Sequence, residues 1–270
     1  MGYYFFTKPP REDRSVSQAG VENRAMLTKR LAAVAAFVPP GAVVADVGTD
    51  HALLPVYLVE SGICPHAIAT ELNDGPYRHA FANICRYGLE EKISLRQGDG
   101  LAPLCPGEAD VVVLAGMGGR SIVRILSSSP EVLAATRRLI LQPMTDVGEL
   151  RSWLADNGWR LVDEDLVEEE GRLYPVIVAE PGREEVSDPF LLEVGPRLVE
   201  KGHPLLPDYL ERLKAGYEKV LGALSCSCRP QALAKAREII KKISRLEEVL
   251  ALAGSDRCGD SRNRGGAGTA

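Results

Sequence analysis

The chain has 270 residues, of which 45% are apolar and 26% charged, and its formal net charge is −5. This composition is typical of a globular protein and excludes an intrinsically disordered chain. No apolar run approaches the ~18 residues of a membrane span. The start, from Met1 to Arg14, lacks the basic beginning and long apolar run of a secretory signal, so we expect a cytoplasmic protein without a membrane partner.

Charged residues are unevenly distributed. Residues 1–45 carry six Lys or Arg and three Asp or Glu, and residues 203–252 carry nine basic and six acidic residues. Residues 163–193, by contrast, carry two basic and eleven acidic residues. Two basic regions therefore flank one acidic segment. This distribution allows a nucleic-acid partner without requiring one.

The six cysteines, at positions 64, 85, 105, 226, 228 and 258, form no CxxC pair and no paired spacing with histidine. In a cytoplasmic chain of this size they are expected to be free thiols. Cys226-Ser-Cys228 is the one metal-binding candidate, but such a pair is more often two small residues near a helix end. We expect no metal.

Helices and strands are expected to alternate along the first two thirds of the chain. The polar first 20 residues, with Pro9-Pro10, predict a flexible extension, and apolar residues at helical spacing predict a helix over Glu22–Phe37. Apolar runs bounded by turn residues predict strands at Ala42–Asp46, His66–Glu71, Ile93–Gln97, Asp110–Ala115 and Arg138–Leu141. Helices are expected between and after them at Leu53–Ser61, Pro76–Tyr87, Ser121–Ser127 and Val147–Asn157. This alternation predicts βαβ units and a parallel sheet.

Two further β-prone runs, Trp159–Val167 and Leu173–Ala179, predict a hairpin joined by an acidic turn. A parallel sheet that ends in an antiparallel hairpin indicates an α/β, Rossmann-like methyltransferase sheet rather than a dehydrogenase sheet. Gly182–Asp188 is expected to be a linker, followed by helices over residues 189–201, 205–224 and 230–252 and a disordered tail over 254–270. The last helix carries an apolar stripe typical of packing on a neighbour. We therefore expect a sheet domain over residues 21–181 and a helical domain over 188–253.

Acids and glycines occur at the ends of four successive predicted strands: Asp46 with Gly48, Glu71, Asp99 with Gly100, and Gly116. Ligands of open parallel sheets bind beyond these strand ends. A carboxylate at Glu71 can accept both ribose hydroxyls of a nucleoside, and Asp99 can accept a hydrogen bond from an adenine amino group. Each acid alone is more often a helix cap or a solvated loop residue. Together they favour an adenosine-containing cofactor such as S-adenosylmethionine, because the chain has neither a full GxGxxG turn nor a Walker loop.

Six short stretches occur in a recognisable series: TKRL at 28–31, VADVGTDHALLP at 44–55, DGP at 74–76, RQGDGL at 96–101, AGMGG at 115–119 and LILQP at 139–143. In these stretches the chain resembles the bacterial tRNA (adenine22-N1)-methyltransferases, the TrmK family, from about residue 27 to residue 253. The resemblance implies a class I S-adenosylmethionine-dependent methyltransferase domain followed by a small helical, coiled-coil-like domain. The first 20 residues and the glycine-rich tail match nothing in that family.

The resemblance also implies roles for the cofactor-binding residues. Asp46 and Gly48 would line the methionine end of the cofactor, Glu71 would hold the ribose, and Asp99 with the Gly100 backbone would hold the adenine. Gly116, in the AGMGG stretch, is expected at the cofactor as well.

Asp50, His51 and Arg30 are the polar groups left for the reacting centre. Met117 stands where many base N-methyltransferases carry an aromatic residue, and it would either contact the target base or fill a gap. Asp50 is the expected acceptor near N6 of an adenine methylated at N1. His51 is either a second polar contact or a structural residue.

A tRNA partner needs a basic path across the protein. The N-terminal helix (Arg24, Lys29, Arg30) and the C-terminal helix (Lys235, Arg237, Lys241, Lys242, Arg245) could supply it, although each residue could equally belong to a solvated helix face. A monomer is expected. The alternatives are a methyltransferase of another RNA, a protein or a small molecule, a non-catalytic RNA-binding protein, and an NAD-dependent oxidoreductase.

Overall fold

The structure, a computed structural model, describes residues 26–224 and 229–260. In this part of the chain one sheet has strands β1 (Val44–Val47), β2 (Ala67–Glu71), β3 (Ile93–Gln97), β4 (Val111–Met117), β5 (Arg138–Pro143), β6 (Trp159–Glu169) and β7 (Arg172–Pro181). The helices around the sheet are α1 (Lys29–Ala36), α2 (Leu53–Glu60), α3 (Asp74–Arg86), α4 (Gly119–Ser127), α5 (Pro130–Ala135) and α6 (Val147–Asp156). Four more helices follow: α7 (Leu191–Val194), α8 (Pro196–Glu200), α9 (Leu206–Leu224) and α10 (Pro230–Asp260).

The strand order is β3-β2-β1-β4-β5-β7-β6. Strands β1 to β5 pair in parallel, whereas β7 is antiparallel to both β5 and β6. The predicted Rossmann-like methyltransferase sheet and its terminal hairpin are therefore confirmed. The order reverses at β1, so the edge beyond the carboxyl ends of β1 and β4 is where a ligand is expected.

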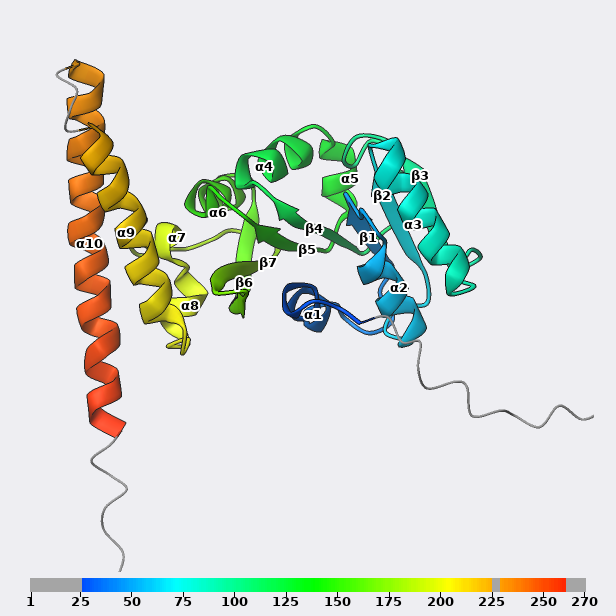
Figure 1. Cartoon of the computed structure of the whole chain (residues 1–270), viewed down its shortest axis with the longest axis horizontal. Helices are drawn as coiled ribbons and strands as arrows, with labels where there is room; N and C mark the ends of the chain where they lie inside the picture. The colour runs from blue at the N-terminus through cyan, green and yellow to red at the C-terminus, as the bar shows by residue number, and fades with distance from the viewer. Residues whose placement is uncertain (1–25, 225–228, 261–270) are drawn as a thin grey trace, which may run out of the picture.

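The sheet is covered on both faces (Figure 1). Strand β4 shows why: its continuous apolar run sends Val111 and Val113 to the layer of α1, α2 and α3, and Val112 and Leu114 to the layer of α4, α5 and α6. Alternate side chains of a strand point to opposite faces, so a run apolar at every position fits a strand buried on both sides. All four residues are at most 1% exposed.

Several element boundaries differ from the sequence-based expectation. Helix α1 begins at Lys29 instead of Glu22, because the Thr28 hydroxyl accepts a hydrogen bond from the Leu31 amide and caps it there. The predicted helix over 189–201 is two short helices, since Pro196 disfavours helical backbone at Gly195. The short helix α5 was not predicted.

Helices α9 and α10 lie side by side and antiparallel, and they extend away from the sheet (Figure 1). Of the predicted apolar stripe, Ile239, Leu246 and Val249 are buried, whereas Leu233 and Ile240 are about half exposed. Helix α10 continues to Asp260, into the segment predicted to be a tail. The rest of that tail and the predicted N-terminal extension lie outside the described residues, as do Cys226 and Cys228.

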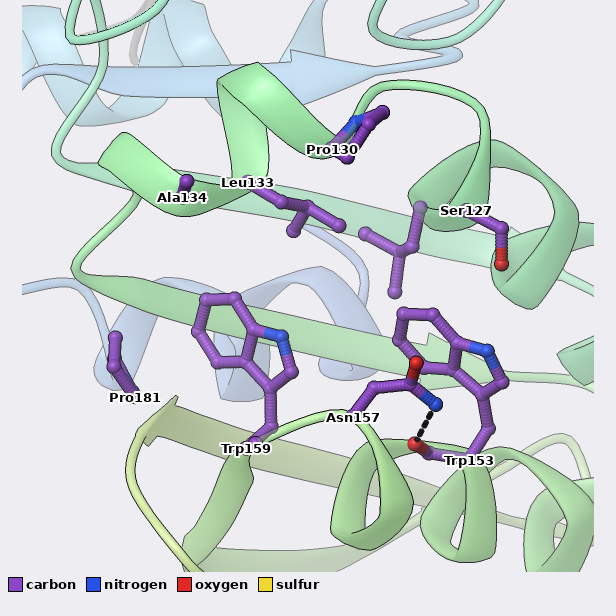
Figure 2. Close-up of a pocket in the computed structure, with 10 residues that line it drawn as sticks. Ser127, Pro130, Leu133, Ala134, Trp153, Asn157, Trp159 and Pro181 are labelled. Atoms are coloured by element: carbon purple, nitrogen blue, oxygen red, sulfur yellow. Dashed lines mark hydrogen bonds between the residues drawn. The ribbon is translucent and has the colours of Figure 1, made fainter.

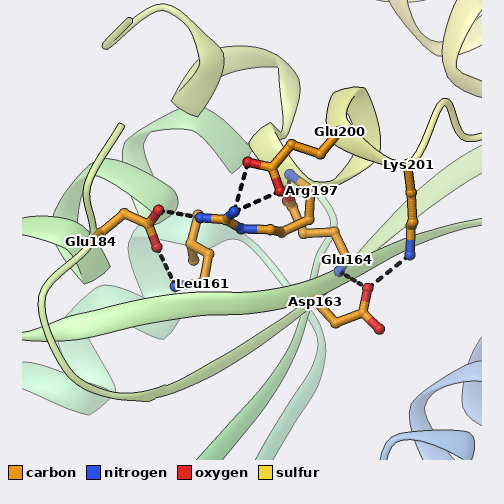
Figure 3. A network of polar contacts seen from close by, with 7 residues as sticks. All are labelled: Leu161, Asp163, Glu164, Glu184, Arg197, Glu200 and Lys201. Carbon is orange, nitrogen blue, oxygen red and sulfur yellow. Dashed lines mark hydrogen bonds and ion pairs between the residues drawn. The ribbon is translucent and has the colours of Figure 1, made fainter. Parts of the chain in front are cut away.

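The segment predicted to be a linker is anchored to both of its neighbours (Figure 3). The buried carboxylate of Glu184 accepts the Leu161 amide hydrogen of β6 at 2.5 Å and pairs with Arg197 of α8. Arg197 also pairs with Glu200 at 2.6 Å, and Lys201 pairs with Asp163 of β6 at 2.8 Å. These contacts attach the helical region to the hairpin.

A fully buried ion pair underlies the same junction. Arg151 of α6 donates from Nε to Glu164 of β6 at 2.6 Å, and both side chains are 0% exposed. Arg151 also donates to the carbonyls of Leu192 and Glu193 at the end of α7, while Glu164 accepts the Arg197 amide hydrogen at the start of α8. Each charge thus satisfies helix-terminal groups as well as its partner.

Candidate active site

Two adjoining cavities open at the carboxyl ends of the parallel strands. One, here called the Glu71 cavity, has a volume of about 400 Å³ and is lined by Glu71, Asp99 and Gly100 among others. The other, the Asp46 cavity, measures about 360 Å³. Five predicted site residues line this cavity and not the first: Arg30, Asp46, Asp50, His51 and Gly116. Gly48 and Met117 line both cavities. The structure therefore brings all ten predicted site residues to one edge of the sheet.

Asp46 is the next-to-last residue of β1, and its buried carboxylate is 6% exposed. Its Oδ2 accepts a hydrogen bond from the Thr49 hydroxyl at 2.6 Å. Burial raises the pKa of Asp46 from its ordinary value of 3.8 to about 6, the Thr49 hydrogen bond offsets part of this rise, and the nearby Glu71 carboxylate adds to it. Among the described residues no cation pairs with Asp46, so the site favours a positively charged ligand.

Glu71 ends β2 and is equally buried. Its Oε2 accepts the Asp50 amide hydrogen at 3.2 Å, and its Oε1 accepts the Asn73 amide hydrogen at 2.9 Å. These backbone donors fix the carboxylate between the loops that follow β1 and β2. A carboxylate held in this way can still accept hydrogen bonds from a ligand diol.

The turn after β1 has an unusual backbone. Asp50 and Ala52 adopt φ values of 51° and 53°, a left-handed conformation that costs a non-glycine residue roughly 1–3 kcal/mol. The turn directs the Asp50 and His51 side chains outward, where they are 63% and 53% exposed. Oδ2 of Asp50 lies 3.6 Å from Nε2 of His51. The Asn83 amide of α3 donates to the His51 carbonyl at 2.9 Å and holds the turn against that helix.

Asp99 and Gly100 follow β3 at the far side of the Glu71 cavity. The Asp99 carboxylate is half exposed and lies 3.4 Å from Nη1 of Arg124, which also lines this cavity. The Gly100 carbonyl accepts the Thr70 hydroxyl hydrogen at 3.0 Å. Gly100 has a φ of 57°, and a Cβ there would lie 2.8 Å from Ile125, so glycine is required.

Met117 separates the two cavities. A Cβ on Gly48 would lie 2.3 Å from the Met117 Cε, so the thioether end rests directly on the glycine turn. Gly48 itself has a φ of 71°. Methionine has three rotatable bonds, so this wall between the cavities is adaptable.

The Arg30 guanidinium is held on several sides. Nε donates to Glu169 at 2.7 Å, Nη1 donates to Gln142 at 3.0 Å, and the Tyr174 ring lies 4.9 Å away. The hydrogen bond from Arg30 holds the pKa of Glu169 below its ordinary range. Gln142 is buried, and its Oε1 also accepts the Gly116 amide hydrogen at 3.2 Å.

Thr49, Gln142 and Glu169 support the site but were not predicted as site residues. Gln142 stands at the end of β5 in the LILQP stretch, so its position at a strand end was a signal. Glu169 belongs to an acidic run that was interpreted as a hairpin turn. Pairing between residues so far apart in sequence has no local signal.

The predicted basic path on α10 is largely neutralised. Lys235 pairs with Glu238 and Lys242 with Glu193, while Arg245 pairs with both Asp188 and Glu248. Arg237 and Lys241 make no ion pair with the described residues. Exposed pairs are weak and can open, but they leave less free charge for a polyanion than the sequence indicates.

A third cavity of about 410 Å³ lies at the opposite ends of the strands (Figure 2). Both tryptophans of the chain, Trp153 and Trp159, line it together with Leu133. It contains none of the predicted site residues, and its polar side chains are limited to Ser127 and Asn157. The chemistry-bearing residues are therefore at the other end of the sheet.

Over the described residues, no group of three or more His, Cys, Asp or Glu side chains is arranged to hold a metal ion. No helix in the same ranges is both long and apolar enough to cross a membrane.

Comparison with known proteins identifies similar chains. Residues 27–177 match a family model described as a methyltransferase domain. The chain is 39% identical over 237 residues to the tRNA (adenine(22)-N(1))-methyltransferase of Bacillus subtilis (strain 168), covering 84% of this chain and 98% of that relative.

Solved structures agree with the sequence comparison. The crystal structure of the B. subtilis m1A22 tRNA methyltransferase TrmK superposes with a TM-score of 0.77 at 36% identity, covering 84% of this chain and 99% of that one. A Streptococcus pneumoniae protein solved in complex with S-adenosyl-L-methionine gives a TM-score of 0.74 at 39% identity, with 83% and 100% covered.

Proposed function

The chain belongs to the bacterial tRNA (adenine(22)-N(1))-methyltransferase family, and from this premise we propose that it transfers a methyl group from S-adenosyl-L-methionine to N1 of adenine 22 in tRNA. One observation carries the proposal: two joined cavities at the strand ends contain buried carboxylates that lack a cationic partner among the described residues. A tRNA substrate would place the enzyme in the cytoplasm, as expected from the sequence, and the monomeric state stays a prediction.

The residues present fit this cofactor. The Glu71 cavity offers a fixed carboxylate for a ribose diol and the Asp99–Gly100 turn for an adenine. The Asp46 cavity offers a desolvated carboxylate for the positive charges of the methionine end. Gly48 joins the two cavities without a side chain of its own, and the flexible Met117 lies between them.

When bound, the cofactor supplies an activated methyl group, so the protein contributes mainly by positioning. Holding two reactants in line can be worth ~7–11 kcal/mol. Asp50, His51 and Arg30 line the Asp46 cavity but not the Glu71 cavity, and we assign the target base to this side. N1 lies on the Watson–Crick edge, so the adenine must be unpaired or flipped out of its stack.

The three polar residues would then act on the base. Methylation at N1 makes the adenine cationic. The Asp50 carboxylate would accept a hydrogen bond from the N6 amino group and so stabilise that charge. Arg30 is fixed by Glu169 and Gln142, so it can donate to the nucleotide without reorganising. His51 would provide a second polar contact beside Asp50.

The test is transfer of tritiated methyl groups from S-adenosyl-L-methionine to tRNA that carries adenine at position 22, with a matched tRNA carrying guanine there. Incorporation into the adenine tRNA alone is expected. If neither tRNA is labelled while the cofactor still binds, the enzyme acts on another RNA or on a small molecule. If the cofactor does not bind, the assignment of both cavities is wrong.

A further inference from the structure

The strained turn that carries His51 also forms one wall of a separate groove along α3. This groove has a volume of about 500 Å³ and is lined by His51, Leu53, His79, Ala82, Asn83 and Arg86. His51 and Leu53 also line the Asp46 cavity, so the groove begins where that cavity ends. None of the lining side chains is acidic, although the chain as a whole carries a net charge of −5.

Two histidines form a stacked pair at the start of the groove. The His51 and His79 rings lie 5.2 Å apart between centroids and are within 5° of parallel. Both residues are exposed, so the stack lies at the surface of the protein. The backbone strain at Asp50 and Ala52 and the hydrogen bond from Asn83 hold His51 in this position.

The groove combines the two features that bind a nucleotide of a single-stranded segment. Exposed aromatic rings provide a stacking platform for any base, and a cationic side chain contacts the phosphate. Arg86 lies on the same face of α3 as His79, two turns further along the helix, and lines the same groove. A flipped adenine leaves its neighbour without a stacking partner, so the stacked imidazoles stand where such a partner is needed.

We propose that the His51–His79 stack and Arg86 form a binding subsite for a tRNA nucleotide adjacent to the target adenine, with its base on the imidazole stack and its phosphate at Arg86. This inference rests on the proposed function, because it assigns the tRNA path next to the methylated base. It also directs that path along α3, from the groove to the Asp46 cavity with which it shares His51 and Leu53.

The experiment uses the full-length chain and compares His79→Ala and Arg86→Ala with two matched controls. Arg78→Ala removes an exposed arginine of the same helix that does not line the groove, and His66→Ala removes an exposed histidine beyond the other end of β2. His79→Phe retains an aromatic face. The measurements are the KM and Kd for tRNA, the salt dependence of tRNA binding, and the Kd for S-adenosyl-L-methionine.

His79→Ala is expected to raise the KM and Kd for tRNA about five-fold or more, the lower end of a base-stacking contribution of about 1–3 kcal/mol. His79→Phe should stay within about two-fold of wild type. Arg86→Ala should weaken binding and reduce the slope of log K against log salt by roughly 0.7–0.9, the value of one phosphate contact. The Kd for the cofactor should not change in any variant.

The subsite is refuted if His79→Ala and Arg86→Ala match the two controls in tRNA binding while wild type methylates tRNA. It is also refuted if His79→Phe is as weak as His79→Ala, since stacking would then not be the cause. Failure of the proposed function looks different, because wild type itself would then neither bind nor methylate tRNA.

Discussion

Replacement of Asp46 by asparagine should stabilise the cofactor-free protein at neutral pH. The pKa of Asp46 rises from 3.8 to about 6 because burial penalises the carboxylate. Between these two pKa values the folded state keeps a proton on Asp46 that the unfolded state has lost. The stability that this proton preference gives the folded state is therefore fully present below pH 4 and is lost as the pH rises through about 6. Two pKa units correspond to about 3 kcal/mol at 1.36 kcal/mol per unit.

An asparagine at this position carries no charge at any pH, so the variant lacks the free-energy cost of burying an ionised carboxylate. The free energy of unfolding of Asp46→Asn minus that of wild type should therefore increase with pH. We expect an increase of about 2 kcal/mol between pH 4.5 and 7.5, since part of the full effect lies below pH 4.5. The Thr49 hydroxyl can still donate to the asparagine carbonyl, so the hydrogen bond is retained.

The assay is urea denaturation of both proteins, without cofactor, at several pH values in this range. Taking the difference between the two proteins removes the contributions of every other titrating group. Asp50→Asn is a matched control for the substitution itself, because it removes a carboxylate that is mostly exposed instead of buried. Parallel stability curves for wild type and Asp46→Asn would refute a desolvated carboxylate at this position.

Three further predictions concern binding, catalysis and the helical region. The wild-type Kd for S-adenosyl-L-methionine should increase about ten-fold from pH 7 to pH 5 in calorimetry, as Asp46 becomes protonated, and a ratio near one would contradict its role toward the cationic end of the cofactor. Asp50→Ala and Asp50→Asn should lower single-turnover methyl transfer about 10²–10⁴-fold with little change in the cofactor Kd; a loss of cofactor binding instead would assign Asp50 to the cofactor site. Glu164→Gln should lower the free energy of unfolding by about 3–5 kcal/mol, because Arg151 is then left buried without its counter-charge. The neighbouring Asp163→Asn, which removes only a half-exposed pair, should cost about 1 kcal/mol or less, and equal losses for the two variants would contradict this reasoning.

The fold could be predicted from the sequence because its signals are local. The run Val111–Leu114 is apolar at every position and β-branched at most of them, which indicates a strand covered on both faces. Glycines and acids mark where the first four parallel strands end. The first and last residues of the helices are harder to predict, because they depend on capping residues such as Thr28 and on helix breaks such as the one before Pro196.

The site could be predicted only in outline. The carboxyl ends of parallel strands in one sheet lie along one edge, so the acids at the ends of β1, β2 and β3 are expected to converge. No comparable rule predicts the side-chain contacts that hold the site residues in place. Glu169 and Arg30 form their contact although they are 139 residues apart in the sequence. The acidic run that contains Glu169 has the composition expected of a solvent-exposed turn, so nothing in it predicts this contact. The stack of His51 on His79 likewise depends on how α3 packs beside the strained turn.

The buried carboxylates of the described residues separate into two kinds, and the difference indicates which serve the fold and which serve a ligand. Glu164 is fully buried against Arg151, so its charge is balanced within the protein. Asp46 and Glu71 are buried almost as deeply, yet their described partners are a hydroxyl and amide hydrogens rather than cations. An unbalanced pair of carboxylates destabilises the empty protein, and a ligand that brings positive charge relieves that cost when it binds. The cost is concentrated beside Gly48, where the two cavities meet, which is the position a cationic nucleoside cofactor needs.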